Sequence, residues 1–372
     1  MKKILKETIS LALAAVLGFG GGMLSKNMGK ENIAVSSPQP LAGTMYSNTG
    51  AGKSLTELFS TSSTSTVADV AAKAAQSVVE IVTETVSTDV FMQQYISEGA
   101  GSGVILTSDG YIVTNNHVIQ ASNKIHVTLK DGTVHEARIV GTDSETDIAV
   151  VKVDAGVLVP AIYGDSSTLV VGETAIAIGN PLGQLGGTVT DGIISALDRE
   201  ITIDNETMTL LQTNAAINPG NSGGGLFNSK GELIGIVNAK SSGSGIEGLG
   251  FAIPVNTAKP VIDDIIAYGY ARGRIDTGLS FVDVTSPQSA WMYRVSYLGV
   301  YISKVAENSN AFKSGLRSGD LILAVDNKAI TSTSDIKKAL KDKSVGNSIT
   351  LTVFRNQIKH EFTFTLAEYN PV

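Results

Sequence analysis

Residues 217–227 read INPGNSGGGLF, a stretch that places one serine, Ser222, among four glycines. Glycine adopts positive φ without strain and lets a backbone approach another group closely, so the stretch predicts a tight loop. Such a loop is compatible with a surface turn. It is equally compatible with a nucleophilic serine whose neighbouring amides point at a reacting oxygen. The rest of the chain decides between these two interpretations.

A nucleophilic serine needs a base that takes the hydroxyl proton and a carboxylate that orients the base. His117 follows the β-branched stretch YIVTNN, and Asp147 opens the apolar stretch DIAVVKV. The order along the chain is therefore His, Asp, Ser, one of the orders in which this triad recurs. Each residue alone also has a structural interpretation, His117 as a histidine at a strand end and Asp147 as a turn or cap residue.

The composition excludes several other classes of protein. Of the 372 residues, 42% are hydrophobic and 17% are charged, which is typical of globular chains. A net charge of −7 without a basic stripe argues against nucleic-acid binding. Cysteine is absent, and the four histidines (His117, His126, His135 and His360) lack the spacing of a zinc protease site. We expect no metal and no cofactor, and we interpret His126 and His135 as surface residues facing each other across a hairpin.

The first 24 residues predict export. Lys2, Lys3 and Lys6 precede an apolar run from Ile9 to Leu24, which is slightly short for a spanning helix of roughly 17–25 residues. Two interpretations stay open: an uncleaved signal anchor of a single-pass cell-membrane protein with its catalytic domain outside the cytoplasm, or a signal peptide whose cleavage releases a secreted protein. Residues 25–66 are rich in Ser, Thr and Gly and predict a flexible linker.

Two domains are expected after the linker. Residues 67–272 are a succession of short β-branched stretches separated by turns such as Asp109-Gly110 and Asp131-Gly132, which predicts an all-β barrel or sandwich that ends in a helix over Ala258–Ala271. Residues 273–372 mix strands with short helices and predict a smaller α+β domain. In it we expect a helix capped by Thr333 or Ser334 and a hairpin across Arg355-Asn356.

Three motifs in this order resemble the HtrA/Deg family of trypsin-like serine proteases: TNNHVI (114–119), TDIAVVKV (146–153) and NPGNSGGGLF (218–227). The similarity continues through GETAIAIGNPLG and GLGFAIPVN and covers nearly everything from Val67 to the C-terminus. It implies a mostly-β fold, namely a chymotrypsin-like double β-barrel with the active site between the barrels, followed by a smaller α+β PDZ domain. It also implies a serine endopeptidase without a cofactor. Homotrimers are usual in the family, and the composition does not test this.

The resemblance implies a role for each residue of the triad. Ser222 is the nucleophile, His117 accepts its proton and later protonates the leaving amine, and Asp147 holds the imidazole. The amides of Gly220 and Ser222 form the oxyanion hole.

The neighbours of the nucleophile carry two further expectations. Gly223 and Gly224 are expected to keep bulk away from the substrate. Asn221 is uncharged and cannot pair with a freed N-terminal amine, so activation by zymogen cleavage is not expected. The family resemblance instead implies activation through surface loops that are ordered by a bound peptide, the PDZ domain or neighbouring subunits.

Further positions carry over to substrate and peptide binding. Asn238, Ala239 and Lys240 are expected to pair with the substrate backbone, next to a mobile loop SSGSGIEGLG (241–250) beside the specificity pocket. No acidic residue is evident at the base of that pocket, which favours cleavage after small or medium apolar residues. The segment YLGV resembles the carboxylate-binding loop of PDZ domains and is otherwise a plain turn into a strand. The residues predicted at the PDZ groove are Tyr297, Leu298, Gly299 and Val300 in the loop, Tyr301–Val305 as the pairing strand, and Ile336 and Leu340 as the pocket wall.

The sequence thus favours an exported serine endopeptidase that cleaves misfolded or exposed polypeptide segments in extracytoplasmic quality control. C-terminal peptides bound at the PDZ domain are expected to regulate it. A dedicated signalling protease and a peptide-binding chaperone or scaffold are the alternatives. The filled His-Asp-Ser positions disfavour a pure scaffold.

Overall fold

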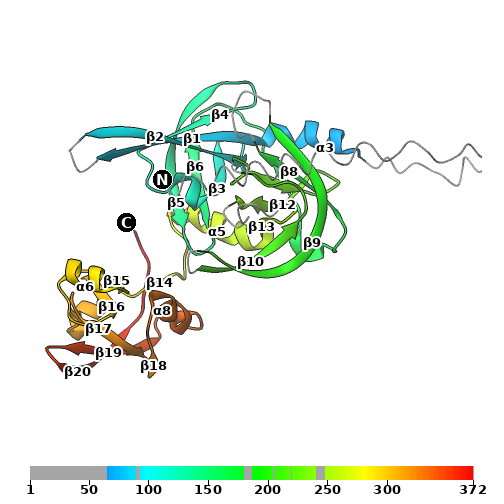
Figure 1. The fold of residues 1–372 in the computed structure, drawn as a ribbon. Helices are drawn as coiled ribbons and strands as arrows, with labels where there is room; N and C mark the ends of the chain where they lie inside the picture. Colours follow the sequence, from blue (N-terminus) through cyan, green and yellow to red (C-terminus); the bar gives the residue numbers. More distant parts are fainter. Residues whose placement is uncertain are drawn as a thin grey trace, which may run out of the picture. The chain divides into compact units, whose positions relative to one another are not determined.

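The computed structural model describes residues 65–88, 93–179, 187–203, 206–218, 220–239 and 248–371 (Figure 1). The predicted signal segment 1–24 and nearly all of the predicted linker 25–66 lie outside these residues. Within the part of the chain that is described, no helix is long and apolar enough to cross a membrane.

The first barrel is a closed sheet of antiparallel strands in the order β1-β2-β3-β6-β5-β4, preceded by helix α3 (Val67–Ala74). Its strands are β1 (Val78–Thr88), β2 (Gln94–Ile105), β3 (Tyr111–Asn115), β4 (Lys124–Thr128), β5 (Val134–Asp143) and β6 (Ile148–Val153). β-Branched residues dominate β1, β3 and β6, and their inward side chains fill the barrel. Ile81, Ile112 and Val151 are fully buried in this core.

The second barrel is a sheet in the order β11-β8-β9-β10-β13-β12-β7, which an additional pairing of β11 with β12 closes. Its strands are β7 (Ile162–Tyr163), β8 (Thr174–Gly179), β9 (Thr188–Ile203), β10 (Glu206–Thr213), β11 (Gly225–Phe227), β12 (Glu232–Val237) and β13 (Gly250–Pro254). One hydrophobic cluster contains residues of both barrels, among them Val113 and Ile148 from the first and Ile178 and Phe227 from the second. The predicted double barrel is confirmed.

Helix α5 (Val255–Tyr268) closes this unit three residues earlier than the sequence predicts. It ends at Gly269, whose φ of 85° is left-handed and favours glycine. Its buried residues recur at helical spacing and contact strands of both barrels, including β5, β6 and β12. The buried residues are Val255, Ala258, Ile262 and Ile265.

The C-terminal domain has its own core, which includes Val300, Ile322, Ile336 and Leu351. Its main sheet has the order β15-β16-β17-β19-β20, with β18 beside β17, and β14 pairs with β21 apart from it. The elements are β14 (Ile275–Asp276), β15 (Leu279–Val284), α6 (Pro287–Tyr293), β16 (Gly299–Val305), α7 (Asn310–Ser314), β17 (Leu321–Val325), β18 (Lys328–Ala329), α8 (Thr333–Leu340), β19 (Ser348–Arg355), β20 (Ile358–Thr365) and β21 (Ala367–Glu368). This is the predicted α+β domain.

Two local predictions in this domain are off by one residue or more. The N-cap of α8 is Ser332, not Thr333 or Ser334, because Asp335 completes a capping box with Ser332. The hairpin between β19 and β20 turns at Asn356-Gln357, where φ is 50° and 61°. Positive φ at both turn residues is what a two-residue hairpin turn requires.

The prediction that Tyr301–Val305 pairs with a bound peptide is wrong. These residues belong to β16, which pairs with β15 along its length and with β17 at Val300 and Tyr301. Because the strand lies inside the sheet, no continuous edge is open for another strand. The pairing of Gly299 with Val284 also places the YLGV segment beside the C-terminal end of β15.

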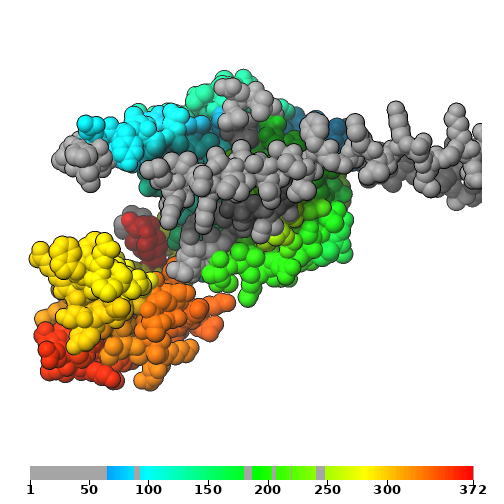
Figure 2. Space-filling view, viewed as in Figure 1, coloured from blue at the N-terminus to red at the C-terminus, as the bar shows by residue number. Residues whose placement is uncertain are grey.

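Exposed apolar side chains gather on α6 and the segment after it, which is yellow in the space-filling view (Figure 2). Trp291 is 83% exposed, and Tyr297 and Leu298 of the YLGV segment belong to the same set. The Tyr297 ring also contacts Phe354 edge-on.

Candidate active site

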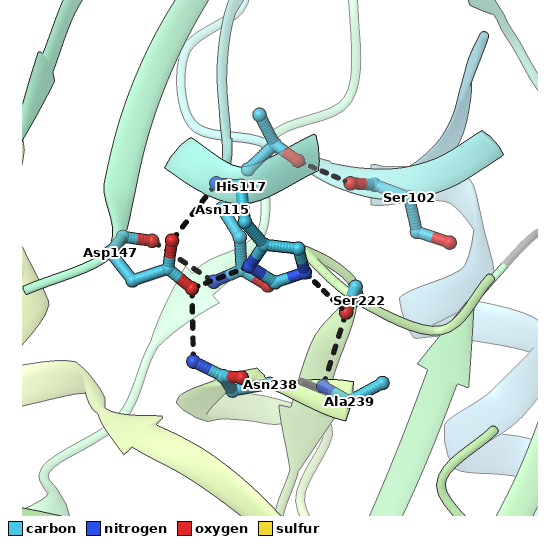
Figure 3. Close-up of polar contacts among 8 residues, drawn as sticks. Ser102, Asn115, His117, Asp147, Ser222, Asn238 and Ala239 are labelled. Atoms are coloured by element: carbon cyan, nitrogen blue, oxygen red, sulfur yellow. Dashed lines mark hydrogen bonds and ion pairs between the residues drawn. The ribbon is translucent and has the colours of Figure 1, made fainter. Parts of the chain in front are cut away.

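The three residues predicted as a triad come from different elements. His117 lies in the short helix α4 (Asn116–Ile119), which follows β3 directly. Asp147 lies in the turn between β5 and β6 and has a φ of 55°, a left-handed conformation that Asp tolerates better than most residues. Ser222 lies in the loop before β11 of the second barrel. Figure 3 shows their side chains converging.

The distances between these side chains form a continuous hydrogen-bonded chain. His117 Nδ1 lies 2.6 Å from Asp147 Oδ2, and His117 Nε2 lies 3.0 Å from Ser222 Oγ. The backbone amide of His117 donates to Asp147 Oδ1 at 2.9 Å. Because a carboxylate only accepts, the proton belongs on Nδ1, and the lone pair of Nε2 faces the serine hydroxyl. A base of this kind, oriented by a third group, is what an activated serine needs.

Asp147 is held from several sides, and one of its partners was predicted in another role. The side-chain amide of Asn238 donates to Asp147 Oδ2 at 3.0 Å. The carbonyl of Asp147 accepts from the Asn116 amide at 3.0 Å and from Asn115 Nδ2 at 3.1 Å. Asp147 is only 7% exposed. A buried carboxylate needs such donors, because an unpaired one is costly.

The nucleophile loop presents backbone amides without acceptors. Gly220 has a φ of 102°, and the Asn221 amide donates to the Asn218 carbonyl at 3.0 Å, which closes a tight turn. Gly220 and Ser222 are buried, yet among the described residues neither of their amides donates to a protein group. Buried amides are normally paired, so these two are available for a ligand oxygen.

The glycines after the nucleophile serve the packing of the loop, not clearance for substrate as predicted. A Cβ on Gly223, whose φ is 82°, would lie 2.2 Å from both the Ser102 carbonyl oxygen and Thr114 Oγ1. A Cβ on Gly224 would lie 2.4 Å from the Ile178 carbonyl oxygen. These neighbours belong to the two barrels. The glycines therefore let the loop approach both barrels closely.

Ser102 and Thr114 were not singled out from the sequence. In β2, the Ser102 amide donates to the Ser222 carbonyl at 2.7 Å, and Ser102 Oγ donates to the Gly220 carbonyl at 2.6 Å. Thr114 Oγ1 donates to the Ser102 carbonyl at 2.7 Å. The signal in the sequence was GAGSG (99–103), since glycines inside a strand often mark a close backbone approach.

The residues predicted to bind the substrate backbone are only partly described. Lys240 and residues 241–247 lie outside the described residues. The Asn238 amide donates to the Phe251 carbonyl at 2.9 Å, and the Ala239 amide donates to Ser222 Oγ at 3.1 Å. The Ala239 amide thus touches the nucleophile directly.

Two further sequence expectations concern residues outside the triad. Asn221 is 1% exposed, and its Nδ2 donates to the Ala216 carbonyl at 3.4 Å. The two hairpin histidines are not paired as expected, because His126 lies opposite Glu136 and His135 opposite Val127. His126 instead contacts Glu84, with Nε2 and Oε1 3.6 Å apart.

In the C-terminal domain, α8 contacts the edge strand β15. The Thr333 amide and hydroxyl donate to the Asp283 carboxylate at 2.9 and 2.8 Å. Of the two predicted wall residues, Ile336 is 3% exposed and belongs to the domain core, and Leu340 packs half-buried against it. The outer edge of β15 pairs with no other described strand.

Comparisons with known proteins agree with this architecture. Residues 101–236 match the trypsin-like peptidase domain family, and residues 276–366 match the PDZ domain family. The serine protease Do-like HtrB of Bacillus subtilis (strain 168) is 43% identical over 274 residues, which are 68% of this chain and 59% of HtrB. The serine protease Do-like HtrA of the same organism is 41% identical over 278 residues, 69% of this chain and 61% of HtrA.

Solved structures give the same result. The HtrA-type protease AlgW with decapeptide is 34% identical with a TM-score of 0.54, and the match covers 82% of this chain and 100% of AlgW. The serine endoprotease from Yersinia pestis is 33% identical with a TM-score of 0.52, covering 82% of this chain and 98% of that one.

Fold and site together define a trypsin-like serine peptidase domain followed by a PDZ domain. The two Bacillus relatives are longer, and this chain spans 59% and 61% of their length. The chain belongs to the HtrA/Deg family.

Proposed function

We propose that the chain is a serine endopeptidase with Ser222 as nucleophile. The observation that carries the proposal is the chain of contacts from Ser222 Oγ through His117 to Asp147, at 3.0 and 2.6 Å. A hydroxyl bonded to the free nitrogen of an imidazole, which a buried carboxylate orients in turn, is the arrangement that makes a serine nucleophilic. Separate structural roles for the serine, the histidine and the aspartate would not explain why their side chains form one continuous hydrogen-bonded chain.

The reaction follows from these positions. Ser222 Oγ attacks the scissile carbonyl carbon while His117 Nε2 takes the hydroxyl proton, and Asp147 stabilises the resulting imidazolium. The negative charge on the former carbonyl oxygen is held by the unpaired amides of Gly220 and Ser222. His117 then protonates the leaving amine. A water molecule, deprotonated by the same histidine, attacks the acyl-enzyme and releases the second product.

The proposed substrate class rests on the family and on two expectations from the sequence, namely export and a specificity pocket without an acidic residue. We infer that unfolded or exposed polypeptide segments are cleaved outside the cytoplasm, after small or medium apolar residues. A relative from Rickettsia prowazekii, 41% identical, carries the description probable periplasmic serine endoprotease. The predicted export segment supports the same location, either anchored in the cell membrane or secreted. A dedicated signalling role and a peptide-binding chaperone role stay alternatives, and a homotrimer is proposed from the family alone.

The PDZ domain is proposed to bind peptide C-termini along β15, not along β16. A peptide strand needs an edge with unpaired amides and carbonyls, and β15 is such an edge with α8 beside it. The loop before β15 contains Gly278 with a φ of 67° and is our candidate for the carboxylate site. The similar structure of AlgW contains a decapeptide, which supports the proposal that this chain also binds a peptide.

We further infer that order in the nucleophile loop controls activity. Asn221 is uncharged and buried, so it cannot form an ion pair with a freed N-terminus. If only a fraction of the molecules has the competent loop, the rate falls by that fraction, and a ligand that favours the competent form restores it.

The direct test of the proposed activity is hydrolysis of unfolded casein by the full-length chain and by Ser222→Ala. Loss of a triad residue typically lowers the rate by several orders of magnitude. Casein cleavage at a similar rate by the variant, after removal of contaminating proteases, contradicts the proposal. For the PDZ domain, a peptide with a free C-terminus should bind the full-length Ser222→Ala chain more tightly than its C-terminal amide. Equal affinity of the two peptides refutes carboxylate recognition.

A further inference from the structure

We propose that Ser102 is a positioning residue for the oxyanion hole, acting through its hydroxyl on the carbonyl of Gly220. The inference rests on the proposed endopeptidase function. Ser102 belongs to the first barrel, while Gly220 and Ser222 belong to the loop that enters the second barrel. The hydroxyl therefore connects the orientation of the oxyanion loop to the barrel that carries His117.

The geometry around Ser102 is specific for a hydroxyl. Its side chain is fully buried, and its Oγ donates to the Gly220 carbonyl at 2.6 Å. Its amide donates to the Ser222 carbonyl at 2.7 Å, and its carbonyl accepts from Thr114 Oγ1. Figure 3 shows Ser102 on its strand near Ser222, whose carbonyl accepts from the Ser102 amide. An alanine could fill most of the same volume, but only a hydroxyl can satisfy the Gly220 carbonyl.

Gly220 needs such support because it has no side chain of its own. Its φ of 102° lies in a region that glycine enters freely, and glycine also populates many other conformations. The turn bond from the Asn221 amide to the Asn218 carbonyl closes the loop around Gly220. The Ser102 hydroxyl fixes the direction of the Gly220 carbonyl. Both bonds hold the peptide group between Gly220 and Asn221, which lies in the chain between the two oxyanion amides, and so they restrain the backbone on which the Gly220 and Ser222 amides are carried.

The contacts of Ser102 that attach the nucleophile loop to β2 are distinct from the contact that orients the Gly220 carbonyl. The bond between the Ser102 amide and the Ser222 carbonyl does not need the hydroxyl, so Ser102→Ala keeps the nucleophile loop attached to β2. What this variant loses is the hydroxyl that donates to the Gly220 carbonyl. An oxyanion hole acts in the transition state more than in the ground state, so the loss is expected in kcat and not in KM.

The test uses the purified full-length chain and its variants Ser102→Ala, Ser102→Thr and Ser102→Val. Threonine and valine have nearly the same volume, so any overpacking is common to both, and only threonine retains a hydroxyl. Ser166→Ala is the matched control, because Ser166 is a buried serine of the same domain that accepts from the Asn256 amide at 3.1 Å. For each variant, kcat and KM are measured on a chromogenic peptide. The affinity for a peptide boronic acid is measured as well, since its tetrahedral adduct places an oxygen in the oxyanion hole.

A buried acceptor that loses a side-chain donor changes an equilibrium about 5- to 150-fold. We therefore expect kcat of Ser102→Ala to fall at least about tenfold, with KM within about twofold and the boronic-acid affinity weakened in parallel with kcat. Ser102→Thr should exceed Ser102→Val in kcat by a similar factor, and Ser166→Ala should match the wild type.

Two results for Ser102→Ala overturn the inference: a kcat within twofold of the wild type, or a loss of kcat with unchanged boronic-acid affinity. Equal kcat for the threonine and valine variants also overturns it, whatever the alanine variant does. A wild-type chain that hydrolyses neither the chromogenic peptide nor unfolded casein, with or without a peptide that binds the PDZ domain, refutes the proposed function instead. The wild-type measurement thus distinguishes the two failures.

Discussion

Asn238→Ala tests whether the buried amide beside Asp147 supports catalysis or only binds the substrate backbone. Asn238 is 1% exposed, and its Nδ2 lies 3.0 Å from Asp147 Oδ2. A hydrogen bond to a charged group contributes about 1.5–3 kcal/mol. After the substitution, the Asp147 carboxylate keeps both donors from His117 but loses the third. Because the imidazolium forms in the transition state, most of this loss should appear in kcat.

The expected decrease in kcat is about 10- to 100-fold, since each 1.36 kcal/mol corresponds to a factor of ten. Asn238→Asp should be worse. It would place a second carboxylate about 3 Å from the first, and two like charges at that distance repel by about 5 kcal/mol at an effective dielectric constant of 20. The matched control is Asn256→Ala, which removes an amide–carboxylate bond of 2.7 Å to Asp165 at an exposed position. That variant should keep the wild-type kcat.

The assay is steady-state hydrolysis of a chromogenic peptide, with kcat and KM reported separately. An unchanged kcat with a raised KM for Asn238→Ala would mean that Asn238 acts through the substrate backbone, as the sequence predicts. A kcat for Asn238→Asp equal to that of Asn238→Ala would refute the electrostatic part of the reasoning.

Two further predictions concern stability. Gly223→Ala should lower the melting temperature and abolish hydrolysis, because its Cβ would lie 2.2 Å from atoms of Ser102 and Thr114. The control is Gly132→Ala, since Gly132 has a similar φ of 85° but no atom within 4 Å of the added Cβ. It should lower the free energy of unfolding by only about 1–2 kcal/mol. Equal destabilisation by both refutes the steric argument. Hydrogen bonds from Thr331 and Ser332 lower the pKa of Asp335 from 3.8 to about 2, so the carboxylate stabilises α8 fully above pH 3.8, and this stabilisation is lost as the pH falls toward 2. Hydrogen exchange of the α8 amides, corrected for intrinsic rates, should show protection that falls with pH in the wild type and not in Asp335→Asn. The same pH dependence of protection in both chains contradicts this prediction.

The sequence predicted most of what depends on local pattern. Alternating β-branched stretches with Asp-Gly turns predict strands, and the three motifs that resemble the HtrA/Deg family predict that His117, Asp147 and Ser222 meet. The geometry places these three within hydrogen-bond distance. The helix before residue 272 was found with an error of three residues, because its end depends on one left-handed glycine, Gly269.

What the sequence did not predict depends on contacts between distant segments. Asn238 was assigned to the substrate from the family resemblance, but its side chain turns toward Asp147, 91 residues away. Ser102 contacts a loop 118 residues further along the chain. Gly223 was explained by the substrate, although its neighbours are Ser102 and Thr114. The PDZ strand was misassigned because a short β-branched stretch does not reveal whether it lies at an edge or inside a sheet.

The central claim is that Ser222 is a nucleophile activated by His117. The most direct measurement is labelling of the full-length chain with a fluorophosphonate, which reacts with activated serine hydroxyls, followed by mass spectrometry of the digested protein. The expected result is one label per chain on Ser222, and little or none in His117→Ala, since the base that removes the hydroxyl proton is missing. A wild-type chain that stays unlabelled, or that carries the label on another serine, contradicts the claim.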